Sequence, residues 1–128
     1  MLYLIANKIS DIKVLENVNF KELKVLFLNH NKISDIKVLE KANFIKLVKL
    51  NLSWNKISDI NVLGKVNFKE LELLNLSWNK NKISDINVLG KVNFEKLKEL
   101  DLSQNEINKE KNSLLISKLK LKINDFII

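Results

Sequence analysis

Few side chains in this sequence could do covalent chemistry. The chain of 128 residues contains one histidine, His30, and neither cysteine nor arginine. Without cysteine there is no disulfide, thiolate metal site or thiol nucleophile, and one imidazole is too few for a multi-histidine metal site. His30 could face Ser53 on a neighbouring strand, but nothing orients the imidazole and no glycine-rich phosphate loop is present. We therefore expect no catalytic residues, no metal and no cofactor, and so a non-enzymatic protein.

A column of aspartates is the next group that could carry chemistry. Its members precede short apolar stretches at regular spacing and are Asp11, Asp35, Asp59 and Asp85. Aspartate in this position caps short helical turns, and we favour that role. A calcium-binding column is the alternative, but the glycine-rich loops of calcium-binding solenoids are absent, since the chain has only two glycines.

Asparagines form a second column, with spacings of 24, 24, 24 and 26 residues: Asn7, Asn31, Asn55, Asn79 and Asn105. A buried amide normally forms hydrogen bonds with backbone groups. We expect these side chains to form a buried ladder that joins the turn of one unit to the next. A metal-binding column is the less favoured alternative.

These columns exist because the whole chain is a repeat. The pattern L-x-x-L-x-L-x-x-N-x-I begins at Leu23, Leu47 and Leu97, and a truncated copy opens the chain. The copy from Leu71 carries two extra residues between Asn79 and Ile83, and segments 57–68 and 83–94 are identical. Alternation around each leucine pair predicts one short strand per unit. We expect the extra residues to bulge at the turn and to leave the flanking strands paired.

Over essentially its whole length the chain resembles the leucine-rich repeat family. The Ile-Ser-Asp-Ile that follows the template asparagines is similar to the short-repeat subfamily, which includes bacterial internalins and the leucine-rich regulatory subunits of protein phosphatase. The resemblance implies an α/β fold: a right-handed leucine-rich repeat solenoid with a curved parallel β-sheet on the concave side and short helices or turns on the convex side. We expect one domain, residues 1–128, with units starting near residues 1, 23, 47, 71 and 97.

The phenylalanines of the return segments should stack as a spine along the convex wall. They are Phe20, Phe44, Phe68 and Phe94.

The two ends of the repeat differ. At residues 108–128 we expect a helical cap, with a helix over 109–122 that packs Leu115, Leu119 and Ile123 inward. A final strand at 123–128 should follow, because its apolar pattern repeats that of 97–102 after 26 residues. A register built on Ile116 and Leu121 ranks second.

The first strand has no such cap, which leaves Leu2, Leu4 and Ile9 uncovered. Either the chain is a fragment of a longer array, or another copy covers this edge as a two-fold homodimer that joins the two first strands antiparallel.

Function on a repeat scaffold is carried by the variable positions around each strand. Both tryptophans occupy the same variable position, and His30, Phe27 and Tyr3 should continue their stripe. Clustered aromatics outside a core are typical of protein-binding surfaces, although the second tryptophan could simply be a duplicated copy. The predicted partner-binding residues on the concave face are Tyr3, Phe27, His30, Lys49, Asn51, Trp54, Leu73, Asn75, Trp78, Glu99, Asp101 and Gln104.

The net charge of +7 suggests a second function class. All 22 basic residues are lysine, whereas nucleic-acid surfaces usually recruit arginine for bidentate contacts. We therefore expect a solvated surface, and disfavour nucleic acid and anionic membrane as partners. The resulting hypothesis is a protein–protein interaction module whose partner is another protein. The alternatives are a basic surface binder and a fragment of an internalin-like adhesin. The opening residues do not resemble a signal peptide, which favours a cytoplasmic location.

Overall fold

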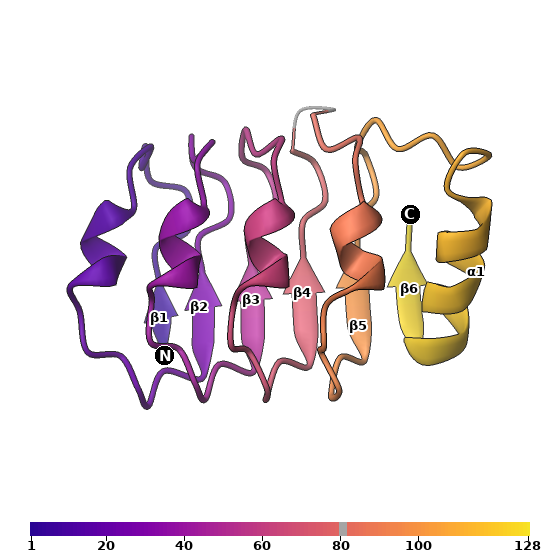
Figure 1. The fold of residues 1–128 in the computed structure, drawn as a ribbon. Coiled ribbons are helices and arrows are strands. Elements are labelled where there is room, and N and C mark those ends of the chain that lie inside the picture. Colours follow the sequence, from indigo (N-terminus) through magenta and orange to yellow (C-terminus); the bar gives the residue numbers. More distant parts are fainter. Residues whose placement is uncertain (80–81) are drawn as a thin grey trace.

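Residues 1–79 and 82–128 form six parallel strands in a single sheet, with one turn of 3₁₀ helix after each of the first four strands (Figure 1). The computed structural model describes residues 1–79 and 82–128. The strands are β1 (Leu2–Tyr3), β2 (Val25–Phe27), β3 (Lys49–Asn51), β4 (Leu73–Asn75), β5 (Glu99–Asp101) and β6 (Asp125–Ile127). The helical elements are η1 (Lys13–Glu16), η2 (Lys37–Glu40), η3 (Asn61–Gly64), η4 (Asn87–Gly90) and α1 (Ser113–Lys122).

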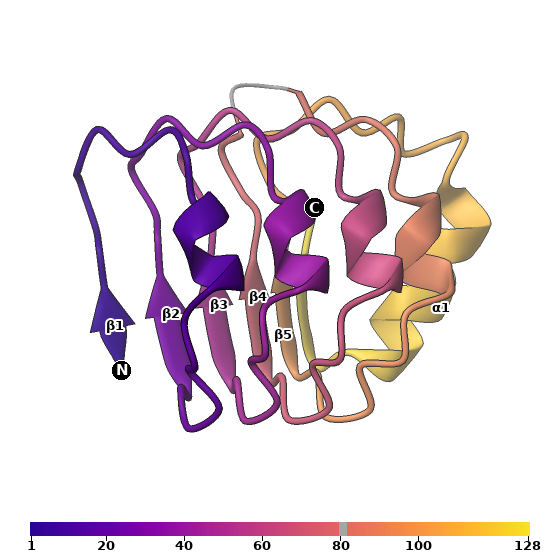
Figure 2. The ribbon, with the colours of Figure 1, turned by 60° about the vertical axis from the view of Figure 1, so that its left-hand side comes forward.

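The strands follow one another in chain order, each paired only with its sequence neighbours. The partners of Leu50 are Leu26 and Leu74, one repeat away on either side. The four 3₁₀ helices and α1 lie in a second row on the other side of the molecule from the sheet (Figure 2). This arrangement is the open parallel sheet of a leucine-rich solenoid, so the predicted fold class is confirmed.

Leucines and isoleucines fill the space between the two rows. The central residue of each inner strand points inward, and Leu26, Leu50 and Leu74 are completely buried. From the return segments, Ile33, Ile57 and Ile83 are likewise completely buried, whereas Ile9 and Ile107 in the outer units are only partly buried. Each unit cannot cover its apolar residues alone, so the core is continuous only because neighbouring units stack.

The asparagine ladder forms as predicted in the inner units. Asn55 Nδ2 donates to the carbonyl oxygens of Leu28 and Leu52 at 3.0 and 3.1 Å, and its Oδ1 accepts the amide of Ile33 at 3.0 Å. One side chain therefore joins its own strand to the preceding unit. Asn7 is the exception: it is exposed and donates only to the Ile5 carbonyl among the bonds of the described residues, because no described unit precedes it.

The aspartates bond to the first amide of each 3₁₀ helix, but from one residue earlier than predicted, because an isoleucine occupies each N-cap position. Asp35 Oδ1 accepts the backbone amide of Lys37, the first residue of η2, at 2.8 Å. Asp11, Asp59 and Asp85 make the same bond to η1, η3 and η4. Each carboxylate satisfies a helix N-terminal amide that has no partner within the helix.

The phenylalanine spine forms in two pairs. Phe20 stacks on Phe44 with centroids 6.4 Å apart, and Phe68 stacks on Phe94 at 6.5 Å. Phe44, Phe68 and Phe94 are almost fully buried, whereas Phe20 in the first unit is half-buried. Burial falls toward the first unit because fewer neighbours cover it.

The C-terminal segment follows the predicted order of helix and strand, with two corrections. The helix begins at Ser113, four residues later than expected. Ile116, Leu119 and Ile123 are buried, whereas Leu115 is only half-buried. The second-ranked register is wrong, because Leu121 is exposed and β6 pairs Phe126 with Leu100.

The two-residue insertion leaves the sheet intact. β4 and β5 pair along their length, with Leu74 opposite Leu100, and Trp78 N donates to Ser103 O at 3.0 Å beyond them. The flanking strands are therefore paired, as predicted. The expected bulge itself falls on residues 80–81, which lie outside the described residues.

Candidate functional site: the sheet face and its aromatic stack

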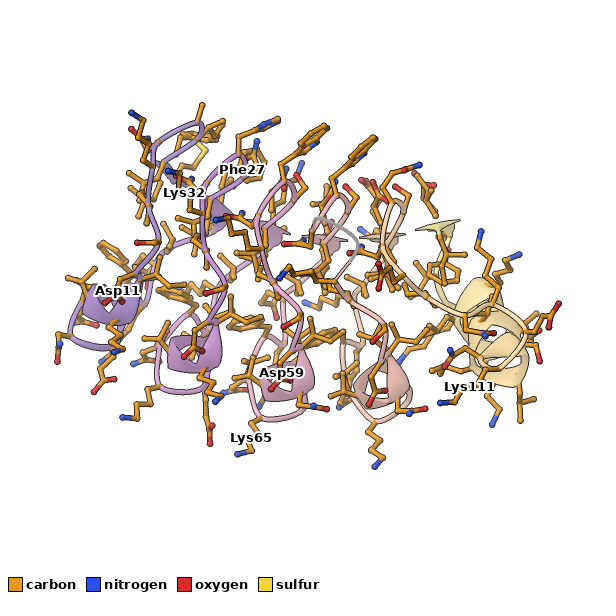
Figure 3. The ribbon with its side chains drawn as sticks, turned by 90° about the horizontal axis from the view of Figure 1, so that it is seen from above. Asp11, Phe27, Lys32, Asp59, Lys65 and Lys111 are labelled. Carbon is orange, nitrogen blue, oxygen red and sulfur yellow. The ribbon has the colours of Figure 1, made fainter. Side chains whose placement is uncertain are left out.

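The outer side of the sheet faces away from the helical row, and we call it the sheet face. Figure 3 shows the labelled Phe27 on this side and Asp59 on the opposite side. Because side chains alternate along a strand, the first and third residues of β2 to β6 point outward here, as does Tyr3, the second residue of β1. Tyr3, Lys49 and Glu99 are exposed on it. Those that are half-buried are Val25, Phe27, Asn51, Leu73, Asn75 and Asp101.

Three rings stack on the turns that follow β2, β3 and β4. The His30 ring lies 5.0 Å from the Trp54 ring with planes 12° apart, and the Trp54 and Trp78 rings are 4.4 Å apart with planes 7° apart. Trp54 and Trp78 remain 44% and 43% exposed. We call these three residues the aromatic stack. Trp54 has a ring on each of its faces, whereas His30 and Trp78 each have one stacking partner among the described residues.

The turn holds these residues in an uncommon backbone conformation. His30, Trp54 and Trp78 have φ of 58°, 55° and 54°, as do the equivalent Ala6 and Gln104 at 56° and 57°. The left-handed region costs a bulky residue on the order of 1 kcal/mol, whereas glycine or asparagine adopts it readily. Stacking of two aromatic rings contributes about 0.5–1.5 kcal/mol. The stack therefore offsets much of the strain that its own residues introduce.

A second aromatic pair lies on the strands themselves. The Tyr3 and Phe27 rings meet edge to face, with centroids 5.3 Å apart and planes at 81°. The sequence predicted a single stripe from Trp78 to Tyr3. The structure instead has two rows, because Phe27 is a strand residue whereas His30 lies on the turn three residues later.

Asn51, Asn75 and Asp101 also hold the turns after their strands by hydrogen bonds, a structural role that was not predicted from the sequence. Asn51 Oδ1 accepts both the backbone amide of Ser53 at 3.0 Å and its hydroxyl at 2.7 Å. Asn75 and Asp101 hold Ser77 and Ser103 in the same way. Each bond pair fixes the turn that carries the next ring position. The recurring Asn/Asp-Leu-Ser sequence was the available signal.

Comparison with known proteins identifies the architecture. A sequence profile described as Leucine Rich repeat matches residues 45–60 and 95–110, which contain β3 and β5 with their template asparagines. An internalin (inlF) from Listeria monocytogenes shares 30% sequence identity with the chain, with a TM-score of 0.74, and the match covers 97% of the present chain. Internalin C2 (inlC2) of the same species shares 29% identity, with a TM-score of 0.70 over 94%. The chain is a leucine-rich repeat protein.

This leucine-rich repeat protein is similar to those internalins in fold and repeat pattern. It spans 32% of the length of the first internalin and 46% of the second. No protein with a curated description matches the sequence.

The far end of the sheet face is acidic. Glu99 and Asp101 on β5 lie beside Asp125 on β6, and the pairing places Glu99 directly opposite Asp125. Asp125 is absent from the predicted face residues because the final strand at 123–128 was treated as part of the cap. The 26-residue spacing that aligned Phe126 with Leu100 also aligns Asp125 with Glu99, and was the available signal.

The chemistry considered for His30 finds no support in the geometry. Its ring stacks on Trp54, and the Ser53 hydroxyl donates to Asn51 Oδ1. Within residues 1–79 and 82–128 no group of three His, Asp or Glu side chains is arranged to hold a metal ion. Over the same residues no helix is long and apolar enough to cross a membrane.

Among the groups of residues 1–79 and 82–128, Lys96 has a shifted pKa, and it lies outside the site. A hydrogen bond from Lys96 to Glu70 at 2.6 Å, together with the charge of that carboxylate, raises the pKa of the lysine above 10.5. Glu70 belongs to the preceding unit. The shift therefore reflects a contact between units and not a functional group.

Proposed function

We propose that this leucine-rich repeat protein is a non-enzymatic interaction module that binds a partner protein through the sheet face. The observation that carries the proposal is the aromatic stack: two half-exposed tryptophans and a histidine, stacked on the turns that follow β2, β3 and β4. Exposed tryptophans surrounded by polar groups are typical of protein-binding hot spots. Solenoid proteins use their extended sheet surfaces for such binding.

The backbone supports the same interpretation. Asparagine adopts the left-handed conformation readily and is abundant in this chain, yet tryptophan occupies the left-handed position at residues 54 and 78, with φ near 55°. The turn has the same conformation in every unit, at Ala6 and Gln104 as well, so what distinguishes the third and fourth units is the bulky residue that fills the position. Core packing does not account for the indoles, since nearly half of each is exposed. Binding of a partner to the exposed parts of the indoles accounts for bulky residues at a position that strains their backbone.

The test replaces both indoles without unfolding the turn. Asparagine tolerates φ near 55°, so the double variant Trp54→Asn/Trp78→Asn should keep the fold. Leu121→Asn is the matched control, because Leu121 is the most exposed large apolar residue and lies on α1, away from the sheet face. Proteins captured from a cell extract by the chain should be retained by the control and lost by the double variant. For a purified partner the loss should be about thirtyfold or more, as for hot-spot residues.

Salt dependence separates this proposal from its alternative. A partner held by the indoles should dissociate only slightly more readily as the salt concentration rises. Binding to a polyanion through lysines weakens steeply with salt and should survive loss of both tryptophans. Binding of nucleic acid or anionic membrane that the double variant retains and that weakens steeply with salt would replace the protein-binding proposal by the polyanion one.

A further inference from the structure

The sheet face differs in charge from the rest of the molecule. Although the chain carries a net charge of +7, the outward strand positions hold one base, Lys49, and three acids. The acids, Glu99, Asp101 and Asp125, all lie on the last two strands. The face is therefore apolar and aromatic over the first strands, and acidic at the opposite end.

These three carboxylates are not neutralised by the ion pairs of the described residues. The five ion pairs there join other carboxylates to lysines of neighbouring units, as in Lys98–Glu72. Asp101 has one oxygen in its own turn and the other 3.4 Å from Asn75 Nδ2. Like charges directly opposite on paired strands, such as Glu99 and Asp125, destabilise a sheet. A cation supplied from outside would remove that cost.

A hollow of about 210 Å³ lies over β4, β5 and β6, and all three carboxylates line it. Leu73 and Ile127 contribute apolar surface to the same hollow. A carboxylate rim beside apolar surface matches the shape of a long basic side chain, whose methylene stem covers apolar groups while its charged end meets the acids.

The hollow adjoins the aromatic stack. Asn75 lines the hollow, and Trp78 lies three residues farther along the same segment. Three residues of extended chain span about 10 Å. One segment of a partner protein is therefore long enough to contact the indoles and to enter the hollow.

We propose that the partner is a protein whose binding segment places an apolar side chain against the aromatic stack and a lysine or arginine side chain in this acidic hollow. The proposal rests on the proposed function, since it specifies the occupant of the same sheet face. Its basis is charge complementarity: an acidic, partly apolar hollow next to exposed aromatics, on a chain that is basic elsewhere.

The test needs no known partner. The probe is a phage library of random dodecapeptides selected on the immobilised chain. Peptides retained by the chain but not by Trp54→Asn/Trp78→Asn define the binders of the sheet face. Those binders should be enriched in lysine and arginine over the unselected library. Selection on Glu99→Gln/Asp125→Asn should abolish the basic enrichment and keep the apolar one.

A matched variant controls for net charge. Glu95→Gln/Glu110→Gln removes the same number of charges from exposed positions away from the hollow. For a synthetic tryptophan-free binder, with affinity followed by the fluorescence of Trp54 and Trp78, loss of Glu99 and Asp125 charge should weaken binding about tenfold. The control variant should bind nearly as tightly as the unmodified chain.

The outcomes distinguish the two proposals. Binders that depend on the tryptophans but show no basic enrichment, or that weaken equally in the control, would overturn the basic-partner proposal and leave the interaction module standing. A selection in which no retained peptide depends on the tryptophans would count against both.

Discussion

The asparagine ladder makes a graded prediction about stability, because three of its members differ in their hydrogen bonds. Asn55 is fully buried, donates to Leu28 and Leu52, and accepts the Ile33 amide. Asn105 donates to two carbonyls in the same way, but its Oδ1 has no partner within the described residues. Asn7 is exposed. The same substitution to alanine thus removes a different number of bonds at each site.

The magnitudes follow from the groups left unsatisfied. Asn55→Ala leaves the buried Ile33 amide without its acceptor, at about 1–3 kcal/mol, and removes one of two donors from the carbonyls of Leu28 and Leu52, at about 0.5–1.5 kcal/mol each. Those carbonyls keep their bonds from Asn31 and Asn79. We expect a loss of about 3–5 kcal/mol in the free energy of unfolding at Asn55. Asn105→Ala breaks no bond from a backbone amide to Oδ1, so it should lower the free energy of unfolding by about 1–3 kcal/mol less than Asn55→Ala does. Asn7→Ala should change the free energy by no more than about 0.5 kcal/mol, as exposed substitutions do.

Equilibrium urea unfolding followed by circular dichroism measures all three variants. The slope against urea also shows whether the array still unfolds as one unit, since a broken inner unit can uncouple the two halves. Equal losses at Asn55 and Asn105 would refute the idea that the Oδ1 bond between units stabilises the ladder. A large loss at Asn7 would show that the first turn is held by contacts other than those described.

Three further outcomes are expected. Phe68→Ala should lower the free energy of unfolding by about 3–5 kcal/mol, because the ring is buried and stacks on Phe94; a melting temperature within a degree of the unmodified chain would contradict this. If two copies pair through the edge of β1, the double variant Leu2→Lys/Leu4→Lys should abolish that concentration-dependent self-association, measured by sedimentation, and an unmodified chain that stays monomeric at high concentration would exclude the dimer. The pKa of Lys96 is raised above 10.5 by Glu70, so their contact should stabilise the fold below pH 10.5 and be lost as the pH rises through the raised value. The difference in urea midpoint between the unmodified chain and its Glu70→Gln variant should accordingly close in strong alkali, and a difference that persists there would contradict the assignment.

The sequence by itself determined the repeat and everything that one repeat imposes on the next. Strand positions, the inward leucines, the aspartate caps and the inner asparagine bonds were all predictable from the spacing. The reason is physical: each of these groups has partners at a fixed offset, so one correct alignment of Leu26 with Leu50 places all of them. The burial of the ladder asparagines follows from the same alignment, because a buried polar side chain needs a hydrogen-bond partner and the backbone offers the same one in each unit.

Only the tertiary structure decided how the outward residues meet. The turn conformation that brings the rings of His30, Trp54 and Trp78 face to face depends on backbone angles that residue type does not reveal. The acidic hollow requires β6 to pair with β5, which joins residues of the last unit to those of the cap. Outward side chains are free of the repeat's core constraint, so their neighbours are set by the geometry of stacked units and not by the template.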